Sequence, residues 1–102
     1  MKVFISPLAQ EKIKLLLEYL EEEWSIKVKE DFIKKLKQSV GQISKQPYSC
    51  PQSKETKIFK CVVSKQTSFF YRIKTEEIEI ITLIDNRQNP KEIQKWLKKN
   101  FG

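Results

Sequence analysis

The sequence predicts an α+β domain in the order β-α-α-β-β-β-α, with a helical hairpin packed on an antiparallel sheet and a short C-terminal helix. Two observations lead to this fold class. Between residues 7 and 46 the apolar residues recur every three or four positions, which is typical of amphipathic helices. From Thr56 to Ile84 they alternate instead, in a segment rich in β-branched and aromatic residues. A chain of 102 residues suits one domain covering residues 1–102.

The first half of the chain predicts one strand and two helices. Residues 2–6 form a short apolar segment, which predicts a strand. Ser6 can cap a helix that Pro7 begins and that ends near Glu23. Ser25 can cap a second helix, and the two should form an antiparallel hairpin because few residues join them. The apolar stripe of the first helix consists of Ile13, Leu16, Leu17, Leu20 and Trp24.

The second half predicts a three-stranded meander and a last helix. A loop with two prolines covers residues 45–55. Short polar separators favour antiparallel pairing, and the third strand should be central because it is apolar on both faces. Asn89 can cap a helix that Pro90 begins, with Glu92 at capping-box spacing. The strands are predicted over residues 56–63, 68–74 and 77–84.

Composition narrows the classes of function. The net charge of +7 favours an anionic partner, although a lysine-rich surface that keeps the protein soluble explains it equally well. With no histidine and two cysteines, we expect no metal site, and with two glycines no phosphate-binding loop and no cofactor. No apolar stretch reaches roughly 18 residues, and the N-terminus turns polar too soon for a signal peptide. We therefore expect a cytoplasmic protein without a membrane partner.

Arg87 is one of only two arginines in a chain that otherwise uses lysine for positive charge. It follows the most apolar strand, at the turn into the capped last helix. A planar guanidinium held on such a turn suits phosphate or carboxylate. An internal pair with Asp85, two residues earlier, explains the position equally well. The sequence leaves both roles open for Arg87.

The chain also resembles a known family. The element order and the segment FFYRIKTEEIEIITLIDNRQNP are similar to the RelE/ParE superfamily, toxins of bacterial type II toxin–antitoxin systems. Members often have a YRI-like strand, a hairpin, an apolar strand and a turn with an arginine, here Tyr71-Arg72-Ile73, residues 78–84 and Arg87. The opening SPLAQEKIKLLLEYL also resembles the family. The resemblance implies a small toxin that inhibits growth, a role in plasmid stabilization, and a cognate antitoxin that neutralises the toxin.

The resemblance implies one of two targets. RelE-like members are ribosome-dependent mRNA endonucleases that use lysine, arginine and tyrosine, whereas ParE-like members are associated with poisoning DNA gyrase. The early-strand arginine of the nucleases falls at Ser68, and their C-terminal acid–base residue falls near Ile93. Lys57 and Lys60 are three apart on the preceding predicted strand, so they should face opposite sides of the sheet. This favours a ParE-like toxin that binds gyrase and is not an enzyme.

Two alternatives stay open. One is a ribosome-dependent endonuclease acting on mRNA with Arg87, Lys60 and Lys57 as catalytic candidates, and the other is a non-toxic, basic nucleic-acid-binding module. An antitoxin should cover the sheet and the groove beside the helical hairpin, because an acidic partner complements a basic surface. The sequence does not choose between a homodimer and a toxin–antitoxin hetero-oligomer. The candidate binding residues are Arg87, Arg72, Tyr71 and Asn86.

Overall fold

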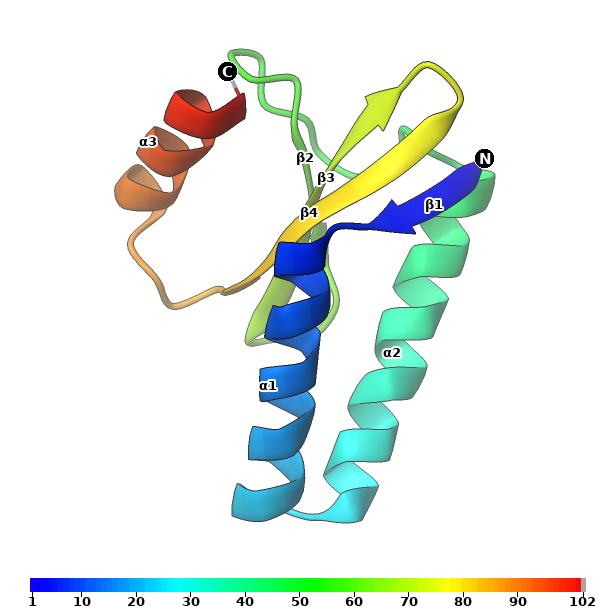
Figure 1. The fold of residues 1–102 in the computed structure, drawn as a ribbon, viewed down its shortest axis with the longest axis vertical. Coiled ribbons are helices and arrows are strands. Elements are labelled where there is room, and N and C mark those ends of the chain that lie inside the picture. Colours follow the sequence, from blue (N-terminus) through cyan, green and yellow to red (C-terminus); the bar gives the residue numbers. More distant parts are fainter. Residues whose placement is uncertain (102) are drawn as a thin grey trace.

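A computed structural model describes residues 1–101 and has a four-stranded sheet between two helical layers. Figure 1 shows α1 and α2 side by side as an antiparallel hairpin, with α3 on the other side of the sheet. The predicted order β-α-α-β-β-β-α is confirmed. The elements are β1 (Lys2–Ile5), α1 (Pro7–Glu23), α2 (Ile26–Lys45), β2 (Phe59–Val62), β3 (Thr67–Lys74), β4 (Glu77–Asp85) and α3 (Pro90–Phe101).

The sheet has the strand order β1-β4-β3-β2 and is mixed. Strands β2, β3 and β4 form the predicted antiparallel meander. The sequence-based expectation of an antiparallel sheet needs correction at β1, which pairs with β4 in parallel, Val3 opposite Ile78. The two-helix connection after β1 carries the chain away from its neighbour, so no tight turn in the sequence signals that pairing. The predicted central position of β4 is confirmed, because it lies between β1 and β3.

A bulge in β4 changes which residues of the strand face each side of the sheet. Phe70 pairs with Thr82, but Tyr71 pairs with Ile80, so Ile81 is the extra residue. Ile80 packs toward the hairpin and Ile81 toward α3. Ile81 and Thr82 therefore both lie on the α3 face, and the alternation of the strand shifts by one residue across the bulge.

Two apolar cores result from this arrangement. Along β3, Phe69 and Tyr71 face the hairpin and Phe70 faces α3, as alternation predicts. The α3 core is small, with Ile58, Phe70, Ile81 and Leu97. The hairpin core is larger, with Ala9, Phe32, Ile43, Phe59, Cys61, Phe69, Tyr71, Ile78, Ile80 and Leu83.

Local signals set the helix starts. The Ser6 hydroxyl accepts from the Ala9 N–H at 3.0 Å and donates to the Ile81 carbonyl at 2.6 Å, so it caps α1 and fastens it to β4. Ser25 caps α2 in the same way. The Asn89 side chain accepts from the Lys91 N–H, and α3 begins at Pro90 as predicted. Within residues 1–101, no helix is long and apolar enough to cross a membrane.

Candidate functional site

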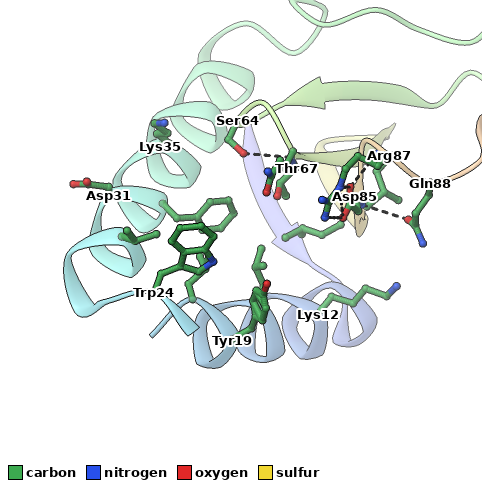
Figure 2. Close-up of a pocket in the computed structure, with 17 residues that line it drawn as sticks. Lys12, Tyr19, Trp24, Asp31, Lys35, Ser64, Thr67, Asp85, Arg87 and Gln88 are labelled. Carbon is green, nitrogen blue, oxygen red and sulfur yellow. Dashed lines mark hydrogen bonds and ion pairs between the residues drawn. The ribbon is translucent and has the colours of Figure 1, made fainter. Parts of the chain in front are cut away.

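A groove of about 700 Å³ opens between the helical hairpin and the end of β4. We call it the hairpin groove. Figure 2 shows Tyr19 and Trp24 on one side and Asp85 and Arg87 on the other. Its floor is apolar and includes Leu20, Phe32 and Leu83. Both charge signs occur around it, from Lys12, Asp31, Lys35, Asp85 and Arg87.

Trp24 is the most prominent side chain of the groove. Its predicted place in the apolar stripe of the first helix is wrong: α1 ends at Glu23, and the Trp24 side chain is 68% exposed. The Trp24 N–H bonds the Leu20 carbonyl as the helix ends, and Ser25 caps α2 at the next position. Tyr19 and Val28 beside it are also exposed. An exposed aromatic beside other apolar side chains is typical of a protein interaction surface.

Arg87 and Asp85 form an ion pair on the groove. The Arg87 Nη2 lies 2.7 Å from Asp85 Oδ2, and Nε lies 3.0 Å from Oδ1. The Arg87 backbone N–H also donates to Oδ1, at 2.8 Å. These hydrogen bonds lower the pKa of Asp85 to about 2 and raise the pKa of Arg87. Of the two roles that the sequence left open for Arg87, the structure therefore shows the internal pair with Asp85. The 72% exposed Arg87 side chain can still reach a partner from its outer edge.

Asn86 fastens the end of β4 to the β2–β3 turn. Its side-chain N–H groups donate to the carbonyls of Ser64 and Lys65, and its Oδ1 accepts from Ser68 at 2.6 Å. Its backbone N–H donates to Gln66 at 2.7 Å. Ser68 is fully buried, and its hydroxyl has a structural role as the donor to Asn86. The chain leading into Arg87 is therefore firmly held.

Tyr71 and Arg72 lie on opposite faces of the sheet. Tyr71 is fully buried, its hydroxyl donates to the Pro47 carbonyl at 2.8 Å, and burial raises its pKa. Arg72 faces α3, with Nε 2.6 Å from Glu79 and its guanidinium 4.9 Å from the centre of the Phe101 ring. Both side chains have partners within the fold, and neither lies in the hairpin groove.

Lys57 and Lys60 do not sit on one strand. The predicted strand over residues 56–63 is wrong at its start, because β2 begins at Phe59. Lys57 lies in a turn with a left-handed φ of 64°, so its comparison with Lys60 by strand alternation fails. Lys60 is exposed opposite Phe70, on the sheet face that carries α3. Arg87 instead lines the groove beside the hairpin.

Comparisons with known proteins place the chain in a family. A family model described as "ParE toxin of type II toxin-antitoxin system, parDE" matches residues 3–90. The chain belongs to this toxin family. The match covers the sheet, the hairpin and Arg87, and it confirms the resemblance to the RelE/ParE superfamily. A type II toxin has a cognate antitoxin as its partner.

A solved structure supports the same fold for this ParE-family toxin. This chain is similar to the solved structure of a YoeB/ParE toxin from Agrobacterium tumefaciens, with a TM-score of 0.60 and 11% sequence identity. The similarity covers 84% of this chain and 99% of that chain. At this identity the likeness supports the fold alone. No curated protein sequence matches the chain.

The structure brings some predicted site residues together and separates others. Arg87 and Asn86 lie on one firmly held turn. Tyr71 and Arg72 lie elsewhere, Tyr71 on the hairpin face of the sheet and Arg72 on the α3 face. A groove beside the helical hairpin was expected from the sequence, but its lining was not, because only the folded chain brings Trp24 opposite Arg87. One signal was available: Ser25, a predicted helix cap, directly follows Trp24 and therefore ends the first helix.

Proposed function

We propose that this ParE-family toxin inhibits growth by binding DNA gyrase, without cleaving RNA. The observation that carries the proposal is the separation of the candidate catalytic residues. Lys60 lies on the α3 face of the sheet, Lys57 lies in a turn before β2, and Arg87 is paired with Asp85 on the hairpin groove. Cleavage of RNA requires groups that converge on a 2′-hydroxyl and a leaving oxygen.

The state of Tyr71 also supports a mechanism without RNA cleavage. A tyrosine that exchanges protons with a substrate must reach it, and its pKa must lie near the working pH. Tyr71 has no exposed surface, its hydroxyl is held by the Pro47 carbonyl, and burial raises its pKa. Within the matched residues, the exposed surface around Trp24 is instead of the kind that binds other proteins.

We place the cognate antitoxin on the hairpin groove. An amphipathic segment of the antitoxin would cover Trp24 and Val28 with its apolar face, as helices do in grooves of this size. Its acidic side chains would lie near Lys12 and Lys35 at the rim. The net charge of +7 supports an acidic partner, because complementary charge favours association and register.

Two assays, one on the purified toxin and one in cells that express it, test the proposed target. Gyrase supercoiling of plasmid DNA should be inhibited by the toxin and restored by adding the antitoxin. Primer extension on transcripts from cells expressing the toxin should show no new ends. If the transcripts were cut within translated codons and gyrase were unaffected, the protein would be a ribosome-dependent mRNA endonuclease and this proposal would be wrong. A chain that inhibits neither process would support the non-toxic nucleic-acid-binding module.

A further inference from the structure

A short ladder outside the main strands joins the α2–β2 connection to the edge of the sheet. Gln52 and Phe59 form an isolated antiparallel bridge. Next to it, the Lys60 N–H donates to the Pro51 carbonyl at 2.9 Å. The connection therefore turns back and runs antiparallel to the first residues of β2, which is the edge strand.

Extending this register by one residue places Cys50 opposite Cys61. The hydrogen bond between Lys60 and Pro51 marks a hydrogen-bonded pair, so the next pair, of the two cysteines, is non-hydrogen-bonded. In such pairs the Cα atoms lie about 4.5 Å apart and the side chains approach closely. Disulfides join Cα atoms about 4.4–6.8 Å apart, so the extended register would bring the two cysteines within the range of a disulfide.

The surroundings of the two thiols differ. Both cysteines are free, but Cys61 belongs to the hairpin core and is 4% exposed, whereas Cys50 packs against that core and is only partly buried. The pKa of the Cys61 thiol is raised to about 12, mainly by burial and in part by the neighbouring Cys50 thiol. Cys50 packs against the core that contains Cys61, so both thiols lie on the hairpin side of the sheet. Cys50 is the thiol that an external reagent reaches first.

We propose that Cys50 and Cys61 are a modification site that closes to a disulfide when the protein meets a small-molecule disulfide oxidant. The Cys50 thiolate attacks one sulfur of the oxidant and releases its other half as a thiol, leaving a mixed disulfide at Cys50. The Cys61 sulfur then attacks the Cys50 sulfur while its proton passes to the departing half, which leaves as a second thiol. Two hydrogens and two electrons pass from the protein to the oxidant.

The disulfide would clamp the α2–β2 connection to the edge strand. Hydrogen bonds from the Tyr71 hydroxyl to Pro47 and from the Lys60 N–H to Pro51 join this connection to the sheet. Further bonds of Gln52, Ser53 and Thr56 lie within it. A covalent ring between Cys50 and Cys61 restricts the unfolded chain and leaves the folded backbone in place. The thermal midpoint of the oxidised protein should therefore rise by about 10 °C.

The experiment exposes the folded, reduced protein to oxidised glutathione and follows thiol content, intact mass and thermal midpoint. Wild-type protein should lose both thiols, lose the mass of two hydrogen atoms, remain monomeric, and melt at a higher temperature. Cys61→Ser should stop at a glutathione adduct on Cys50. Cys50→Ser should stay reduced, because the buried Cys61 is out of reach.

Three results would overturn the proposal. They are a wild-type protein that keeps both thiols free, one that accumulates the glutathione adduct on Cys50, and one that forms dimers through disulfides between chains. Peptide mapping of the oxidised wild-type protein decides the linkage directly. The conclusion therefore stands even where Cys61→Ser folds poorly, since Cys61 lies in the hairpin core.

Discussion

The Arg87 guanidinium grips the Asp85 carboxylate across one intervening residue, with Nη2 2.7 Å from Oδ2 and Nε 3.0 Å from Oδ1. The intervening residue, Asn86, is hydrogen-bonded to the β2–β3 turn. The guanidinium is therefore held by its inner edge on a fixed turn, with its outer edge beside the hairpin groove. Little rotamer freedom is left for it to lose when a partner binds.

Arg87→Ala should leave the fold almost intact and weaken binding. The side chain is 72% exposed, so the thermal midpoint should change by no more than about 3 °C. Growth inhibition or antitoxin binding should fall, and Arg87→Lys should restore it only in part, because an ammonium lacks the planar fork. Melts and growth assays on both variants measure this. Arg87 would be structural if Arg87→Ala melted much lower with unchanged toxicity per folded molecule.

The same pair predicts an acid-sensitive contribution to stability. The pKa of Asp85 is lowered in the folded protein from its ordinary 3.8 to about 2, with the Arg87 side chain as the main cause. A lowered carboxyl pKa stabilises the fold above the unfolded-state value, and this stabilisation is lost as the pH falls toward the folded-state value.

Thermal melts between pH 7 and pH 2 of wild type and Asp85→Asn test that sign. Above pH of about 4 the wild type should melt higher than the variant, and the difference should close toward pH 2. Because Asp85 is 40% exposed, solvent screens the pair and the difference will be small. A carboxyl titration of Asp85 by NMR supplies the direct value, and Arg87→Ala should return it toward 3.8. An unchanged titration in Arg87→Ala would contradict the assignment.

Local signals predicted much of the fold, and non-local contacts account for what was missed. Ser6 with Pro7 and Asn89 with Pro90 are cap pairs, and they located the starts of α1 and α3 correctly. The start of the strand at 56–63 was misplaced because lysine gives no sign of a left-handed turn, the conformation of Lys57.

The candidate site likewise combines features that local sequence predicts with features that only the fold creates. The Asp85 and Arg87 pair was a local alternative visible in the sequence, two residues apart. The lining of the hairpin groove and the bridge between Gln52 and Phe59 depend on chain segments that meet only after folding. The parallel placement of β1 beside β4 belongs with them, since a two-helix connection separates β1 from the meander.

Tyr71→Phe should cost stability and leave the activity of the folded protein unchanged. Removing the hydroxyl leaves the Pro47 carbonyl without this donor, which costs about 1–2 kcal/mol. The ring keeps its stacking on Phe59, whose centroid lies 4.8 Å away. Thermal melts measure the cost, and growth inhibition is compared at equal amounts of folded protein. Lost toxicity with unchanged stability would give Tyr71 a direct role that its burial does not suggest.

Trp24→Ala should separate antitoxin binding from folding. The indole is 68% exposed on the hairpin groove, beyond the last turn of α1, so its removal should shift the thermal midpoint by no more than about 3 °C. A large aromatic at the centre of an interface typically contributes at least about 2 kcal/mol, which corresponds to roughly a 30-fold loss of affinity. Titration calorimetry with the antitoxin measures that loss.

Tyr48→Ala is the matched control for Trp24→Ala. Tyr48 is 74% exposed, but it packs edge-on against Phe59 and does not line the hairpin groove. If the groove is the docking site, Trp24→Ala weakens antitoxin binding and Tyr48→Ala does not. If instead the antitoxin adds a strand to the edge strand β2, in place of the ladder that Pro51 and Gln52 form there, the Tyr48 substitution beside Phe59 should have the larger effect. Equal affinities for both variants and the wild type would remove the groove from the interface altogether, because an exposed indole covered by a partner cannot be truncated without cost.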